Sequence, residues 1–216
     1  MADSKASEDR TGFPGIILAG GMSSRMGQDK ARIRLAGSTL LDRAARRLAP
    51  QVTTIAVNAN GPILMEAGQE MPVFADLGPV RAGPLGGIHA AMRRVAESGD
   101  ATHFATVPTD SPFFPADLVS RLAAAIDGDH AIAVATSPGG VHPVFALWPV
   151  ALADDLETWL DTGGALRVRS FLERHRAKDV LFPLIETPRG PFDPFFNINT
   201  PDDLDEAENW LWVLER

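Results

Sequence analysis

Short apolar runs alternate along the chain with segments whose apolar residues recur every three to four positions. The short runs predict strands at residues 15–18, 53–58, 71–75, 102–107, 131–135, 144–148 and 180–184. The periodic segments predict helices over residues 39–49, 88–97, 115–126, 152–160, 165–175 and 201–214. Strand, loop and helix recur three times in this order, which is typical of an α/β fold with a mostly parallel sheet.

The directions in which residues 131–135 and 144–148 pair cannot be read from the pattern. Thr200 is expected to be the N-cap of the last helix. The segment 186–195 contains three prolines, so we predict a mobile loop there. Residues 1–12 are polar and contain no signal-peptide or anchor pattern, so we expect a flexible N-terminus followed by one domain, residues 13–216.

Composition narrows the class of function without identifying it. The formal net charge of −8 disfavours a broad cationic surface for nucleic acid. The chain has no cysteine, which excludes disulfides and thiolate zinc sites and fits a reducing compartment. Charges, glycines and prolines interrupt every apolar run before it reaches membrane-spanning length. We therefore expect a soluble cytoplasmic protein without a nucleic-acid or membrane partner.

A glycine-rich segment follows the first predicted strand and contains Gly20, Gly21, Arg25 and Lys30. Glycines let backbone N–H groups approach an anion closely, and the two cations can balance phosphate charge. The spacing matches neither the Gly-x-Gly-x-x-Gly motif of dinucleotide folds nor the P-loop motif. The segment is therefore predicted to hold a triphosphate, and the alternative is a flexible turn with solvated charges.

Polar residues end or follow three of the predicted strands: Asn58, Asp76 and Asp110. Ligands of open parallel sheets bind beyond the carboxyl ends of the strands. Mg²⁺ usually takes one or two protein carboxylates besides waters and substrate phosphates, so a single aspartate such as Asp110 is sufficient to hold it. The alternatives are that Asp110 forms a turn or caps a helix, that Asp76 forms a turn and that Asn58 ends a strand. None of the five histidines has the spacing of a metal site, and we exclude zinc.

The segment from Leu18 to Lys30 resembles the signature Leu-Ala-Gly-Gly-x-Ser-x-Arg-Met-Gly-x-Asp-Lys of the molybdenum cofactor guanylyltransferases, which belong to the nucleotidyltransferase superfamily. Other blocks resemble that family in the same order: Val57–Asn60, Asp76 ahead of Gly83–Gly87, Pro108–Pro112, His142-Pro143 and Asn197–Pro201. Together the blocks cover nearly the whole chain after Phe13. Departures from the family pattern occur at 79–82 and 188–194, on the acceptor side.

The resemblance implies a single Rossmann-like nucleotidyltransferase domain with helices on both faces of the sheet, which binds GTP and Mg²⁺. It also implies molybdopterin, the Mo cofactor, as the second substrate, and molybdoenzyme apoproteins or their chaperones as recipients of the product. The catalytic residues it implies are Lys30, Arg25 and Asp110. The binding residues it implies are Leu18, Ala19, Gly20 and Gly21 around guanine and ribose, Lys30 at the phosphates, Asn58 and Asp76 at the nucleoside, and Asp110 at the metal.

On the acceptor side, Asn197 and Asn199 alternate around one apolar residue. An extended segment would place both amides on one side, where they could face a pterin or its phosphate. The alternative is a hydrogen-bonded turn ahead of Thr200. His142, in the family block, is expected to help shape the acceptor site.

The expected reaction is in-line attack by the molybdopterin phosphate on the α-phosphorus of GTP, with release of pyrophosphate. No general base is required, because a phosphate monoester is already anionic near neutral pH. Two alternatives remain: a cytidylyltransferase acting on the same cofactor, and a GTP-binding protein that delivers cofactor without chemistry.

Overall fold

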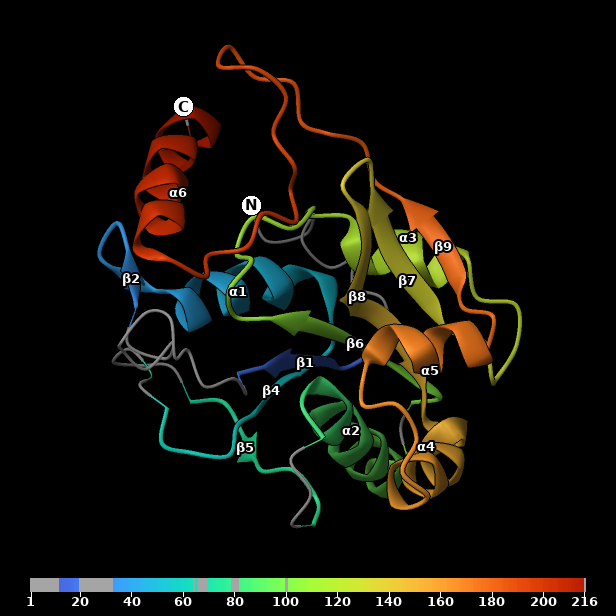
Figure 1. Ribbon diagram of the computed structural model, residues 1–216. Helices are drawn as coiled ribbons and strands as arrows, with labels where there is room; N and C mark the ends of the chain where they lie inside the picture. The colour runs from blue at the N-terminus through green and yellow to red at the C-terminus, as the bar shows by residue number, and fades with distance from the viewer. Residues whose placement is uncertain are drawn as a thin grey trace, which may run out of the picture.

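In the computed structural model, residues 12–19, 33–63, 65, 70–78, 82–99 and 101–215 are described. A seven-stranded sheet has the strand order β5-β4-β1-β6-β8-β7-β9 (Figure 1). Its strands are β1 (Gly15–Leu18), β4 (Ile55–Asn58), β5 (Val73–Phe74), β6 (His103–Pro108), β7 (Ala133–Ser137), β8 (Gly140–Pro149) and β9 (Lys178–Leu181).

Most neighbouring strands are parallel, and β8 is the antiparallel member, pairing with both β6 and β7. The central strand β1 is flanked by β4 and β6, and Leu18 pairs with Asn58 on one side and with Pro108 on the other. This register brings the carboxyl ends of three parallel strands level with each other. The residues that follow them therefore meet at one edge of the sheet.

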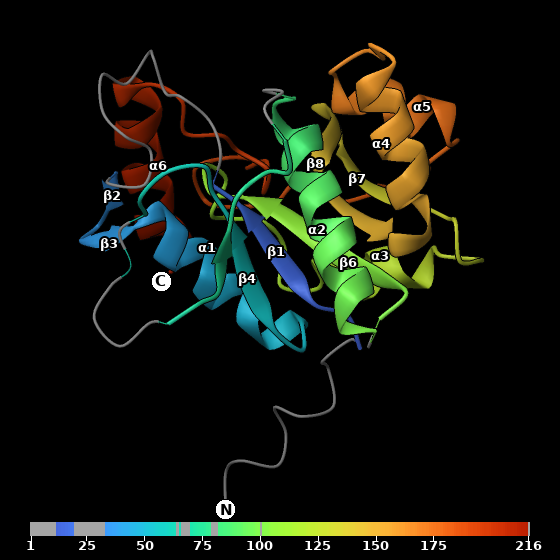
Figure 2. The ribbon, with the colours of Figure 1, turned by 90° about the horizontal axis from the view of Figure 1, so that it is seen from below.

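Helices cover both faces of the sheet (Figure 2). One face packs against α1 (Leu40–Leu48) and α3 (Leu118–Ala124), and the other against α2 (Pro84–Ser98), α4 (Ala153–Asp161) and α5 (Val168–Arg174). Two short 3₁₀ helices, η2 (Ala49–Gln51) and η3 (Val150–Leu152), lie beside α1 and α4. The predicted α/β fold with a mostly parallel sheet and helices on both faces is confirmed.

A smaller core lies beside the sheet and was not predicted. It joins the two-stranded hairpin of β2 (Arg34–Leu35) and β3 (Ser38–Thr39) to the last helix, α6 (Pro201–Leu214). The hairpin turns at Ala36 and Gly37, which both have positive φ. Strands of two residues are too short to leave an alternating pattern in the sequence. The predicted N-cap of α6 is confirmed, because Thr200 forms a capping box with Asp203.

The prediction of a mobile loop over 186–195 is wrong where the segment packs. Phe192 is 2% exposed in the smaller core, Phe195 is 1% exposed in the main core, and Ile185 and Phe192 exchange two backbone hydrogen bonds. The prolines signalled a loop correctly, but the two aromatic side chains anchor it.

Residues 1–11 lie outside the described residues, so the domain boundary stays a prediction. Within the described residues, no helix is both long enough and apolar enough to span a membrane.

Candidate functional site

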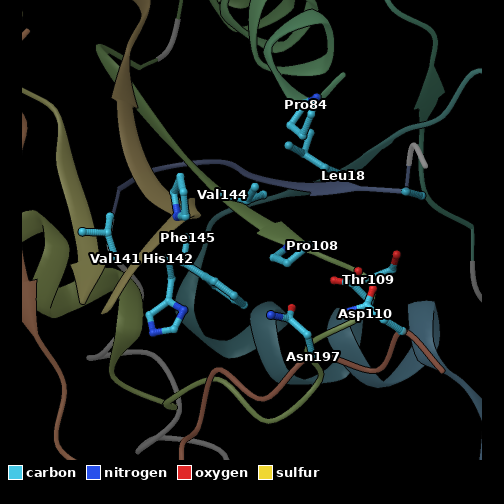
Figure 3. A pocket seen from close by; sticks show the side chains of 13 residues that line it. Leu18, Pro84, Pro108, Thr109, Asp110, Val141, His142, Val144, Phe145 and Asn197 are labelled. Atoms are coloured by element: carbon cyan, nitrogen blue, oxygen red, sulfur yellow. The ribbon is translucent and has the colours of Figure 1, made fainter. Parts of the chain in front are cut away.

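A cavity of about 360 Å³ opens at the carboxyl ends of β1 and β6 (Figure 3). It is bounded by the ends of these strands, the start of α2, the first half of β8 and the segment before α6. Its lining residues are Leu18, Ala19, Pro84, Pro108, Thr109, Asp110, Val141, His142, Pro143, Val144, Phe145, Asn197 and Asn199. Six of the residues predicted at the site are in this set: Leu18, Ala19, Asp110, His142, Asn197 and Asn199.

Asp110 lies two residues beyond β6 and is half-buried at the edge of the cavity. The backbone fixes its position from two sides, since the Thr109 N–H donates to the Leu18 carbonyl (3.3 Å) and the Ile198 N–H donates to the Asp110 carbonyl (2.8 Å). The next helix begins at Leu118, so Asp110 does not cap it. The helix-cap alternative is therefore wrong, whereas the turn alternative is confirmed, because residues 109–110 form a turn directly after β6.

Asn58 and Asp76 form a second polar cluster, next to the cavity rather than in its lining. The Asn58 amide donates to Asp76 Oδ1 (3.0 Å), and the Asn60 amide donates to Asp76 Oδ2 (2.8 Å). The Asp76 N–H donates back to Asn60 Oδ1 (2.8 Å). Asn58 is only 3% exposed, so its amide holds the Asp76 carboxylate in place. Whether either side chain touches a nucleoside stays a prediction.

The first turn of α2 packs against this cluster through two glycines. A Cβ atom on Gly86 would lie 2.8 Å from Asp76 Oδ2, and one on Gly87 would overlap Asn58 Oδ1. Gly87 also faces Leu18. The glycines therefore let the helix approach the two strand ends closely, and Pro84 at the start of the same helix lines the cavity. The N-terminal end of α2, where helical N–H groups favour anions, lies at the same edge of the sheet.

The segment before α6 supplies the opposite wall. Asn197 and Asn199 both line the cavity, on either side of the fully buried Ile198. The predicted alternation is confirmed, and so is part of the alternative, because the Asn199 N–H donates to Asp203 Oδ2 (2.8 Å) in the cap of α6. Asn197 is tied to the strand end, since the Ser111 hydroxyl donates to its Oδ1.

His142 lies in the wall formed by β8. Burial lowers the pKa of its imidazole below the ordinary value, and the nearby Asp193 carboxylate partly opposes this shift. The ring is therefore neutral at neutral pH. Its Nε2 atom is 2.8 Å from the hydroxyl of Ser137.

Some predicted residues fall outside the described part of the chain, and some neighbours of the cavity were missed. Gly20, Gly21, Arg25 and Lys30 lie outside the described residues, so their roles stay predictions. The residues near the cavity that sequence reasoning did not select as site residues include Thr109, Val141, Val144, Phe145, Asn60, Ser137 and Asp193. Thr109 and Asn60 lie in the same motif blocks as Asp110 and Asn58 and could have been found, whereas nothing local marks Ser137 or Asp193.

Within the described residues no group of three or more His, Asp or Glu side chains could hold a metal ion. Asp110 is a single carboxylate at the open edge of the cavity. That donor set does not suit a closed structural site, but it suits a hard cation that completes its shell with waters and substrate phosphates.

The sequence matches the family model of the MobA-like NTP transferase domain over residues 15–180. The molybdenum cofactor guanylyltransferase of Rhizobium johnstonii is 52% identical over 206 residues, which are 95% of this chain and 96% of the relative. A protein of the same name from Cereibacter sphaeroides is 45% identical over 198 residues, which are 91% of this chain and 96% of the relative.

Solved structures share the fold. The molybdopterin-guanine dinucleotide biosynthesis protein A of Archaeoglobus fulgidus aligns with a TM-score of 0.66 at 24% identity, covering 93% of this chain and 99% of that one. A Mycobacterium tuberculosis protein in complex with manganese aligns with a TM-score of 0.62 at 18% identity, covering 93% and 99%. Since the family model covers most of the chain and the similar relatives cover nearly all of it, the chain belongs to the molybdenum cofactor guanylyltransferases, within the MobA-like NTP transferase family.

Proposed function

We propose that this protein transfers GMP from GTP to the phosphate of molybdopterin and releases pyrophosphate. The observation that carries the proposal is the position of Asp110. Backbone hydrogen bonds hold its turn against the end of β1, and its side chain lines the same cavity as Leu18 and Ala19, where the glycine-rich segment begins. An acidic side chain next to a predicted triphosphate-binding loop is the arrangement that metal-assisted nucleotidyl transfer requires.

The cavity is large enough for the reacting ends of two substrates, and its walls differ in chemistry. The end of β1 and the start of α2 form one wall, where we expect the nucleotide. The first half of β8 and the segment before α6 form the other, with the amides of Asn197 and Asn199, where we expect the pterin and its phosphate. Holding both reactants in line supplies much of the rate of such a reaction, because orientation replaces a bimolecular encounter.

The metal we propose is Mg²⁺, held by Asp110. The fit rests on the donor set, since one oxygen ligand at an open edge leaves room for waters and phosphate oxygens. When bound, the ion would neutralise charge on the reacting phosphates. Lys30 and Arg25 would add positive charge around the departing pyrophosphate. Asn58 would act through Asp76, by holding that carboxylate at the nucleoside.

The direct test is pyrophosphate release from purified protein with molybdopterin and either GTP or CTP, in buffers with Mg²⁺, with Mn²⁺ or with a chelator. We expect release with GTP and a divalent cation only. Faster release with CTP would favour the cytidylyltransferase alternative. Tight GTP binding without pyrophosphate release in any buffer would favour a delivery protein and contradict the proposal.

A further inference from the structure

A chain of hydrogen bonds connects the cavity wall to the proline-rich segment. His142 Nε2 on β8 is 2.8 Å from Ser137 Oγ at the end of β7. The Ser137 hydroxyl in turn donates to Asp193 Oδ2 at 2.6 Å. Ser137 and Asp193 lie 56 positions apart in the sequence, and the connection is built only when the β7–β8 hairpin meets the segment before α6.

The number of protons available to this series of hydrogen bonds determines which nitrogen of the His142 ring carries the hydrogen. Ser137 has one hydroxyl proton and donates it to the Asp193 carboxylate, which can only accept. The Ser137 oxygen also accepts from the Gly139 N–H at 3.0 Å. It can therefore only accept from His142, so Nε2 carries the hydrogen. Because the ring is neutral, Nδ1 has a lone pair and is a hydrogen-bond acceptor.

Packing fixes the plane of the ring as well. Phe195 stacks on His142 with ring centroids 4.2 Å apart and an interplanar angle of 21°. Asp193 is fixed too, because its Oδ1 accepts from the Phe195 N–H at 2.9 Å. A side chain at position 139 would collide with this carboxylate, since a Cβ on Gly139 would lie 2.8 Å from Asp193 Oδ2. The positions of the His142 ring and of the Asp193 carboxylate are therefore both fixed by packing and hydrogen bonds.

The open edge of the ring faces the cavity. Among the described residues, no side chain or backbone group bonds to His142 Nδ1, and this atom is not among the buried atoms that lack a partner. Figure 3 shows the His142 ring and the Asn197 amide turned toward each other along one side of the cavity. Asn197 Oδ1 accepts from Ser111, which leaves its NH₂ group as a donor. A hydrogen-bond acceptor and a hydrogen-bond donor therefore line the same cavity.

We propose that His142, held by Ser137 and Asp193 as the Nε2–H tautomer, is the hydrogen-bond acceptor of the acceptor-substrate site and, together with the Asn197 amide, selects a heterocycle with an N–H beside a carbonyl oxygen. The pyrimidinone edge of a pterin has this pair of groups. His142 contacts the substrate, and Ser137 and Asp193 are positioning residues. The inference rests on the proposed function, since the heterocycle belongs to its second substrate.

Asp193→Asn is the sharpest test, because it replaces a hydrogen-bond acceptor with a donor at almost no change in volume. The carbonyl oxygen of the new amide would remain with the Phe195 N–H, and its NH₂ group would face Ser137. The Ser137 hydroxyl would then accept from this NH₂ group and donate to His142 Nε2, so the hydrogen on the ring would move to Nδ1. The acceptor edge would become a donor edge and would face the N–H of the pterin.

Two measurements on the full-length protein test the tautomer of His142 and its role in binding the second substrate. The first is the ¹⁵N NMR spectrum of the histidine rings at neutral pH, with His142→Phe to assign the signals. We expect the Nε2–H tautomer in the wild type and the Nδ1–H tautomer in Asp193→Asn. The second is steady-state kinetics, in which we expect the KM for molybdopterin to rise about tenfold or more in Asp193→Asn and His142→Phe, because a buried donor loses its partner. The KM for GTP should stay unchanged.

His130→Phe is the matched control, since His130 is exposed, and it should leave both constants unchanged. If Asp193→Asn does not fold, Ser137→Ala removes the same two hydrogen bonds, and Ser137→Thr should restore them. An Nδ1–H or doubly protonated His142 in the wild type would overturn the inference. An unchanged KM for molybdopterin in His142→Phe would also overturn it. Absence of any turnover in the wild type would instead contradict the proposed function, while the NMR result would still stand.

Discussion

The two walls of the cavity are built from different kinds of structure. On the nucleotide side, Leu18, Asn58 and Asp110 end or follow adjacent parallel strands whose ends are in register. On the acceptor side, His142 and Asn197 come from the one antiparallel strand of the sheet and from the segment before the last helix. The first wall is set by strand pairing, the second by hydrogen bonds and packing between segments far apart in the chain.

This difference predicts different responses to substitution. A strand end is held by the main chain, so replacing a side chain there removes its chemistry and leaves its neighbours in place. The acceptor wall depends on side chains such as Ser137 and Asp193 for its own geometry. Changes there are expected to move groups and weaken binding of the second substrate before they affect the chemical step.

The largest effect is expected for Asp110→Asn on the nucleotide wall. The variant loses the charge that we propose holds the metal, and turnover should fall by roughly 100- to 1,000-fold at saturating substrates. The melting temperature should change little, because backbone bonds hold this turn. Pyrophosphate release measures the first expectation and calorimetry the second. Asp117→Asn, an exposed aspartate at the start of α3, is the control. Near-wild-type turnover would remove Asp110 from its proposed role.

The next effect tests the glycine-rich segment itself. Lys30→Ala should weaken stabilisation of the transferred phosphates by about 2 to 4 kcal/mol, measured as a lower rate at saturating GTP. Lys178→Ala is the control, because that lysine pairs with Asp127 at an exposed site. If the rate with saturating GTP is unchanged, Lys30 does not act on the phosphates, and the nucleotide wall has no contribution from this lysine.

A smaller effect is expected where α2 approaches the strand ends. Gly87→Ala would push a methyl group into Asn58, and overpacking of this kind typically costs about 1 to 3 kcal/mol. We expect a lower melting temperature and a higher KM for GTP, with an unchanged KM for molybdopterin. Gly128→Ala is the control, since no atom lies near its Cβ position. A rise in the KM for molybdopterin instead would mean that the two walls are not independent.

The smallest effect is a pH dependence of stability. Burial lowers the pKa of His89 on α2, and nearby acidic groups partly oppose that shift. Burial also lowers the pKa of His103 on β6, where the hydrogen bond to the Ala131 carbonyl and then the Asp129 charge oppose the shift. Below the ordinary histidine pKa of about 6.5, the unfolded chain takes up protons before the folded one, so the free energy of unfolding falls as the pH falls. Thermal melts at about pH 7.5 and about pH 5.5, on either side of that value, measure this loss.

His89 is the better test of the pair, because its Nε2 is a buried atom without a hydrogen-bond partner in the described part of the chain. His89→Leu should reduce the difference in melting temperature between the two pH values. An equal difference in this variant would assign the acid sensitivity to other groups.

Local pattern was sufficient to place the main strands and helices and the polar residues at the strand ends, but not to give the antiparallel pairing of β8. The alternation of strands and helices placed Asp110 and Asp76 after strands, and the parallel sheet then brought those strand ends to one edge. The hairpin of β2 and β3 was missed, because two-residue strands carry no period. The segment 186–195 was misjudged, because prolines indicate a loop locally. The burial of Phe192 and Phe195 depends on the two hydrophobic cores into which they pack, which are built from distant parts of the chain.

By itself the sequence determined the fold class, the family and the residues that follow the parallel strands, because these depend on short-range periodicity and on contiguous motifs. Only the tertiary structure decided how the acceptor wall is assembled. His142 was visible as a motif residue, but its tautomer follows from Ser137 and Asp193. The position of the ring proton depends on which groups are in contact in the folded protein. No local sequence pattern predicts the contact between Ser137 and Asp193.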